Sequence, residues 1–132
     1  MKESEHYNAY EEHRDAIFGW ALEIRGLERS QRIIGIHASR AIVELLSAFL
    51  HKKKLVDEGF QLNHRWFKSE RVVEKLPEFK NRRDIVRRIV ELENSSEMLA
   101  YGAPKPTDQI KKVISLFNGV EKEIRAVMDE QV

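Results

Sequence analysis

Cysteine is absent from this 132-residue chain, which excludes disulfide frameworks, thiolate nucleophiles and cysteine-ligated zinc. Its six glycines are too scattered to form a phosphate-cradling loop or a dinucleotide fingerprint. No run approaches the roughly 20 consecutive apolar residues of a membrane span. The first residues, MKESEHYNAYEEH, are acidic and polar, unlike a signal or transit peptide. We therefore expect a cytoplasmic protein with no membrane segment.

The length of the chain favours one folded domain over residues 1–132. A chain of this size can build a core that needs no disulfide or metal. The net charge is +1, but residues 65–88 hold nine basic and four acidic side chains. Such a basic middle suits an anionic partner at one face. The alternative is a well-solvated, salt-bridged surface.

Apolar residues recur at helical spacing along most of the chain, and nowhere do they alternate as in a strand. The pattern predicts four long helices, over residues 3–25, 30–55, 77 or 81–100, and 107–130. A short helix is expected over residues 65–75, ending before Pro77 because the residue before proline disfavours helical geometry. Short connections favour antiparallel neighbours. The predicted fold is an all-α, up-down helical bundle.

Residues 30–55, SQRIIGIHASRAIVELLSAFLHKKKL, are apolar around most of a helix and should form the central one. Gly35 costs this helix about 1 kcal/mol relative to alanine, so it indicates a close approach between helices. Ser30 is the expected N-cap. Gly26 should end the preceding helix, and Thr107 or Asp108 should cap the last one. An apolar face left over on the first two helices would be covered by a second copy, so we expect a homodimer, which light scattering can test.

One polar line remains on the central helix, at steps of three and four residues: His37, Arg40, Glu44, Ser47 and His51. A histidine can move protons near neutral pH, and an arginine can hold a phosphate with two hydrogen bonds. Glu44 could orient either. The alternative is a solvated edge with an Arg40–Glu44 ion pair worth less than about 0.5 kcal/mol.

Two other groups of residues could form a site. Arg32 and His37 are separated by four residues, but five helical steps place them about 140° apart, so they would need a partner chain to converge. The segment Asn63-His64-Arg65-Trp66-Phe67 combines basic and aromatic groups, as single-stranded nucleic acid requires. The basic residues that could extend it are Lys80, Arg82, Arg83, Arg87 and Arg88. The alternative places these aromatics in the core and the arginines on a solvated face.

A metal site is not expected. Glu3-x-x-His6 has the spacing used by carboxylate-bridged di-metal bundles, but no second such pair exists in the chain. We expect no cofactor.

Three features together resemble the HEPN superfamily of small helical bundles. They are the cadence of residues 41–50, AIVELLSAFL, then His64 after a short break, then Tyr101-Gly102 at the end of a later helix. Val43 and Ser47 depart from the glutamate and lysine frequent in that family. Some members are metal-independent RNA endonucleases with an R-x(4–6)-H motif near the last helices, completed across a dimer. No histidine follows His64, so the resemblance implies a non-catalytic member that binds nucleotides or pairs with a minimal nucleotidyltransferase.

The sequence thus predicts a HEPN-like module that binds nucleotide or RNA or pairs with a nucleotidyltransferase. A metal-independent RNA endonuclease with a histidine–arginine site across a homodimer is the first alternative, and a purely structural protein is the second. The candidate binding residues are His37, Arg40, Glu44, His64 and Arg65, with Arg82 and Arg83 as anion contacts.

Overall fold

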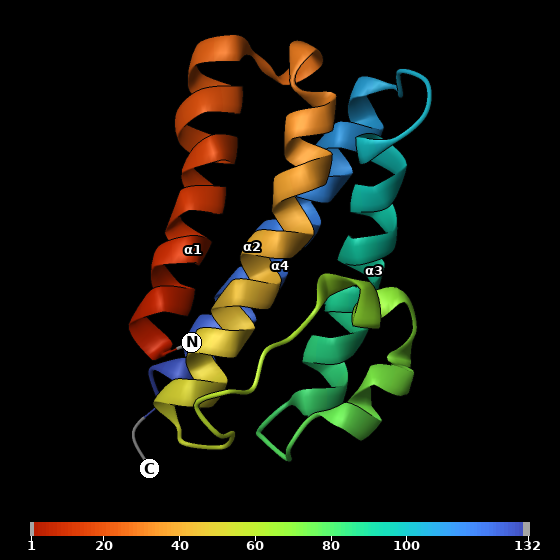
Figure 1. Cartoon of the computed structure of the whole chain (residues 1–132). Helices are drawn as coiled ribbons and strands as arrows, with labels where there is room; N and C mark the ends of the chain where they lie inside the picture. Colours follow the sequence, from red (N-terminus) through yellow and green to blue (C-terminus); the bar gives the residue numbers. More distant parts are fainter. Residues whose placement is uncertain (1, 131–132) are drawn as a thin grey trace.

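The computed structural model describes residues 2–130 and is all-α, with no strand in that range. Four helices run up and down in turn (Figure 1): α1 (Glu3–Asp15), α2 (Gln31–Lys52), α3 (Arg82–Ala100) and α4 (Thr107–Met128). The predicted helical bundle is confirmed. The start of α1 and the end of α4 lie at the same end of the bundle, as an even number of alternating long helices requires.

The first predicted helix is two elements. α1 continues into η1 (Ala16–Arg25), a π-helix, and a 3-10 turn, η2 (Leu27–Arg29), follows. In a π-helix each amide bonds five residues back, as Gly26 N does to Ala21 O at 2.7 Å. Each residue then turns through a smaller angle than in an α-helix, and Ile24 near the end of η1 is 67% exposed. Gly26 ends the element with φ +96°, as predicted.

α2 is the enclosed centre of the bundle, packed by α1, α3 and α4. By length and composition α2 alone among the described helices could cross a membrane, but 72% of its apolar window is buried, as in a core helix. Ser30 does not cap it, contrary to prediction. The Ser30 hydroxyl instead donates to Ala21 O at 3.0 Å and Gly26 O at 2.7 Å, tying η1 to the start of α2.

Gly35 sits where α2 meets the end of α3, which confirms the predicted close approach. A Cβ on Gly35 would lie 2.5 Å from Ala100 N and 2.8 Å from the Leu99 carbonyl carbon. Both are backbone atoms that a rotamer change cannot move. Glycine is required because the two backbones nearly touch.

The segment between α2 and α3 differs from the prediction. The expected single helix is two 3-10 helices, η3 (His64–Lys68) and η4 (Glu70–Lys75), separated by extended Ser69. Asn63 caps η3, its side-chain oxygen accepting from Arg65 N at 2.9 Å. Both pieces pack on α3. Leu76 is extended before Pro77, as predicted.

α3 and α4 begin where the backbone conformation changes, and no side-chain cap marks either start. α3 begins after Asn81, in the left-handed region with φ 63°, which decides between the two predicted starts. α4 begins at Thr107 after Pro106, and neither Thr107 nor Asp108 supplies the predicted cap. The extended Pro106 sets the entry, and its carbonyl accepts from Gln109 N at 2.9 Å.

A buried polar network joins α1 to α4. Tyr10, fully buried, donates its hydroxyl proton to Glu121, and Arg14 Nε donates to the same carboxylate at 2.8 Å. Arg125 donates to the Tyr10 hydroxyl at 2.7 Å and to Tyr7 at 3.2 Å. Burial and the Glu121 carboxylate raise the pKa of Tyr10 to about 12. The network satisfies polar groups that would otherwise be costly to bury.

Replacing Gly35 with alanine should destabilise the fold by about 1–2 kcal/mol, because overpacking against backbone exceeds the gain in helix propensity. Urea unfolding measures the change. The control is Gly119→Ala on α4, where the nearest foreign atom, on the Arg88 guanidinium, lies 3.5 Å from the added Cβ. That variant should be neutral or up to about 1 kcal/mol more stable. Equal stability of both variants would contradict the close approach.

Candidate functional site

Two adjoining clefts, each about 300 Å³, lie where α1, α2, η3 and α3 meet. Both are lined by Arg40, His64 and Arg65, which we call the cation cluster after its two guanidinium groups. The Tyr101 cleft is further lined by Gly35, Ser39, Lys68, Glu93, Glu97, Ala100 and Tyr101. The His13 cleft is further lined by His13, Val43, Glu44, Leu62 and Asn63. Together the two clefts form the groove.

Four of the predicted site residues line the groove: Arg40, Glu44, His64 and Arg65. His37 lies beside it, one α-helical turn before Arg40, in contact with His13. Arg82 and Arg83 begin α3 at the other end of the bundle and line neither cleft. Arg82 donates to Leu76 O and to Glu78. The two anion contacts expected there therefore do not join the site.

His64 is oriented by a buried acid that the sequence analysis missed. Glu93 on α3 is 2% exposed, and its oxygens lie 3.1 and 3.2 Å from His64 Nδ1. A buried carboxylate is costly without a partner, so the pair holds the imidazole in place. Glu93 follows Ile85 and Ile89 at steps of four, an acid within an apolar row. That interruption was the available signal.

The acids of the groove are already paired. Glu44 accepts from His6 at 2.8 Å rather than from Arg40, so the expected Arg40–Glu44 pair is replaced. Glu97 pairs with Lys68 at 3.3 Å.

Two arginines of the groove have no acidic partner among the described residues. Arg40 donates only to the carbonyl of Ile36, and the exposed Arg65 guanidinium has no hydrogen-bond or ion-pair partner within residues 2–130. The groove therefore holds two guanidinium groups that form no ion pair with any acid of residues 2–130.

His13 and His37 join α1 to α2 beside the groove. Their Nδ1 atoms are 2.8 Å apart, so one ring donates and the other accepts. Burial, His37 and Arg40 lower the pKa of His13 to about 4, and burial and Arg40 lower the pKa of His37. Both rings are thus neutral at pH 7. The last two residues of the polar line on α2, Ser47 and His51, make hydrogen bonds within the fold. Ser47 donates to Val43 O, and His51 donates to Phe60 O.

Arg32 and His37 do not form a site within the chain. Arg32 donates to Ala100 O at 3.1 Å and Gly102 O at 2.9 Å, and so satisfies the carbonyls at the end of α3. His37 contacts α1 instead. This separation agrees with the 140° expected from helix geometry.

The aromatics near the cation cluster divide between core and surface. Phe67 is buried, and Trp66 packs on the core beneath the Lys75 ammonium, 4.4 Å from the ring centre. The alternative placing these two in the core is therefore the one observed. The exposed aromatic of the groove is Tyr101, 62% exposed at the end of α3.

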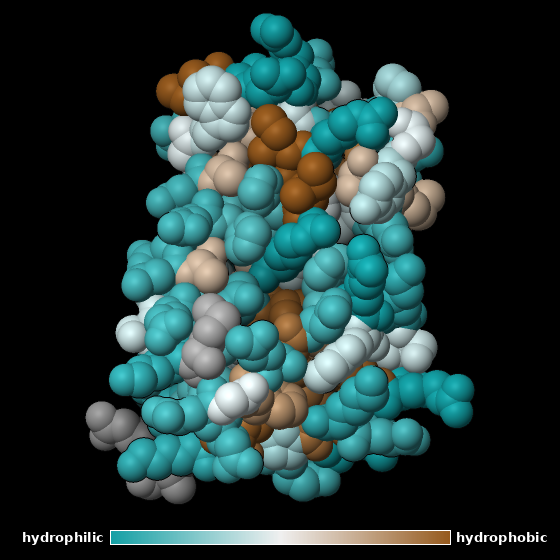
Figure 2. Space-filling model, viewed as in Figure 1, coloured by the Kyte–Doolittle hydropathy of each residue, from teal (hydrophilic) through white to brown (hydrophobic). Residues whose placement is uncertain are grey.

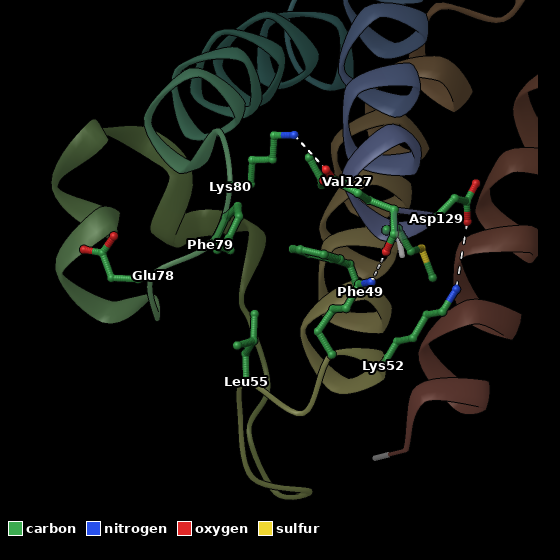
Figure 3. Close-up of a pocket in the computed structure, with 11 residues that line it drawn as sticks. Phe49, Lys52, Leu55, Glu78, Phe79, Lys80, Val127 and Asp129 are labelled. Atoms are coloured by element: carbon green, nitrogen blue, oxygen red, sulfur yellow. Dashed lines mark hydrogen bonds and ion pairs between the residues drawn. The ribbon is translucent and has the colours of Figure 1, made fainter. Parts of the chain in front are cut away.

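The largest cleft, about 840 Å³, lies at the opposite end of the bundle (Figure 3). Phe49, Phe79 and Leu55 give it an apolar lining. Its lysines are compensated, since Lys80 pairs with Glu130 at 2.8 Å, Lys52 with Asp129 at 3.9 Å, and Lys53 donates to Glu130 O. The groove, where cations stay unpaired, is the better candidate.

Hydrophobic side chains gather near the end of the bundle where η1 meets the start of α2 (Figure 2). Those most exposed there are Trp20, Ile24 and Ile36. This is apolar surface on the first two helices, where a second copy was expected, and the homodimer stays a prediction. Within residues 2–130 no three histidine or acidic side chains are grouped to hold a metal ion.

No protein-family model matches the chain, and no curated protein or solved structure matches it. The HEPN resemblance stays a prediction.

Stability should fall as the pH drops from 6.5 toward 4, because the folded state holds His13 neutral while the unfolded chain takes up a proton. After allowance for solvent screening, the loss by pH 5 should be about 1 kcal/mol. Urea unfolding at pH 7.5 and 5 of wild type and His13→Gln measures it. The His13→Gln protein should lose less, while Glu12→Gln on the same helix should behave as wild type. Identical pH dependence of all three would refute the assignment.

Proposed function

We propose that the protein is a binding module for a nucleotide or RNA, and that the ligand occupies the groove. The observation that carries this proposal is that two guanidinium groups without an ion-pair partner in the described chain, Arg40 and Arg65, line the same clefts as His64. The acids that line the two clefts, Glu44, Glu93 and Glu97, pair with His6, His64 and Lys68 rather than with these arginines. A ligand with negative charge completes such a site.

The chemistry of the groove favours a phosphate joined to a base. Guanidinium groups bind phosphate with paired hydrogen bonds, and their charge does not depend on pH in the physiological range. Tyr101 offers an exposed ring face near the cation cluster, and bases stack on such faces. A volume of about 300 Å³ per cleft lies at the lower end for small-molecule sites. Pairing with a minimal nucleotidyltransferase, implied by the HEPN resemblance, remains a further proposal.

Binding of a fluorescent oligoribonucleotide should weaken as salt rises, because phosphate contacts release counterions. Arg65→Ala should weaken binding at every salt concentration and lower the log–log slope by about 0.7, the value for one phosphate of a single strand. Fluorescence anisotropy from low to moderate salt measures both quantities.

The matched control is Arg83→Ala, another exposed arginine, which begins α3 away from the groove. It should keep the wild-type slope. A flat salt dependence of the wild type, or equal losses in the two variants, would reject the groove as the phosphate site.

A second candidate function is metal-independent RNA cleavage, favoured by the His64–Glu93 pair. A carboxylate on Nδ1 leaves Nε2 of the imidazole available to accept a proton, the arrangement of a general base. Here the 2′-hydroxyl would attack the adjacent phosphorus and pass its proton to His64, the P–O5′ bond would break to leave a 2′,3′-cyclic phosphate, and the departing 5′-oxygen would take a proton from water. Arg40 and Arg65 would stabilise the charge on the phosphoryl oxygens.

RNA incubated with the purified protein in EDTA tests this candidate. Cleavage by the wild type that is lost in His64→Ala and retained in His51→Ala would support it. His51 is the control because it lines neither cleft. Intact RNA in the presence of wild-type protein would leave binding alone as the proposed function.

A further inference from the structure

The cation cluster is shared by two clefts rather than placed at the end of one. Arg40, His64 and Arg65 line both the Tyr101 cleft and the His13 cleft, and the other lining residues differ. A phosphate bound at the cluster therefore has space on two sides. A phosphomonoester has only one organic substituent and would leave one cleft to water.

We infer that the groove takes an internal phosphodiester with a nucleoside on each side, the repeating step of a single strand. This inference rests on the proposed function, since it specifies the ligand of the same groove. It distinguishes the two ligand classes that the proposed function leaves open. A mononucleotide with a terminal phosphate is then a partial ligand.

The Tyr101 cleft is suited to one base. Gly35 and Ala100, neither of which carries a large side chain, are among the residues that line it. Tyr101 supplies an exposed ring for stacking. Glu97, which pairs with Lys68 at the surface, supplies carboxylate oxygens that can accept from an exocyclic amino group.

The His13 cleft is suited to the second base. Val43 and Leu62 supply apolar surface, and the imidazole of His13 is neutral at pH 7, so it does not repel a base edge or add charge. Asn63 Oδ1 is used in capping η3, which leaves its amide NH₂ as a donor toward the cleft it lines. Each cleft thus combines an aromatic or apolar side chain with polar side chains that could bond to the edge of a base.

Isothermal titration of the whole protein with adenosine monophosphate and with the dinucleotide ApA tests the inference. ApA should bind at least about tenfold more tightly, because a second stacked base adds roughly that much. Tyr101→Ala and Leu62→Ala should each reduce the advantage of ApA over the monophosphate to about threefold or less. Trp20→Ala, which removes an exposed aromatic on η1, is the matched control and should keep it.

The outcomes separate the two proposals. Equal affinity of the wild type for ApA and adenosine monophosphate would overturn the phosphodiester inference and leave the proposed function standing. An advantage for ApA that survives both cleft variants would also overturn it, because the second base would then lie elsewhere. No binding of either ligand, in a sample whose circular dichroism shows folded helix, would reject the proposed function and the inference with it.

Discussion

The enclosure of α2 is the constraint on which the rest of the structure depends. Three helices pack around it, and at Gly35 its backbone comes within van der Waals contact of the end of α3. A helix held this closely has one narrow edge for polar side chains. Each polar group on that edge must find a partner or reach solvent, because an unpaired buried group is costly. The groove lies between the elements that supply partners for the polar residues on that edge.

α1 completes one side of the edge with two histidines. His6 pairs with Glu44 and His13 with His37, at 2.8 Å in both cases. Each pair of positions is seven residues apart on its own helix, close to two turns, and the order is reversed as antiparallel helices require. The spacing thus matches across the interface. η3 and α3 complete the other side with His64 and Glu93, and the space between these two sets of contacts is the groove.

Long-range regularities of the chain could be predicted from sequence, and local hydrogen-bond choices could not. Apolar periodicity gave four helices because burial of a continuous stripe dominates their formation. Gly35 was informative because glycine inside a helix needs a packing reason. The π-helix at η1 and the split of η3 from η4 depend on which carbonyl each amide selects, which periodicity does not record. The Ser30 cap was wrong for the same reason, since the hydroxyl donates to the carbonyls of Ala21 and Gly26 and does not accept from an amide of α2.

The candidate site likewise combines residues that could be predicted from sequence with one that could not. Arg40, Glu44, His64 and Arg65 were selected because they lay on one helix line or in one basic–aromatic segment, and they do line one groove. Arg82 and Arg83 were added for charge alone, and charge does not determine position. Glu93 was not predicted because it follows Ile85 and Ile89 on the apolar face of its helix, and its partner His64 lies on another element. A buried acid in such a row signals a long-range pair, and here the pair orients a histidine of the groove.

The contrast between the two ends of the molecule bears most directly on function. At the large cleft, every lysine drawn in Figure 3 is matched by an acid or a carbonyl near the end of α4, although that cleft is bigger and more apolar. Along α3, Arg82, Arg87 and Arg88 are likewise paired with nearby acids. Arg40 and Arg65 lack acidic partners within the described chain, while the acids around them are occupied by histidines and a lysine. Two guanidinium groups without an acidic partner in residues 2–130 thus lie in one groove between α2 and η3, and this arrangement is the basis on which we propose an anionic ligand there.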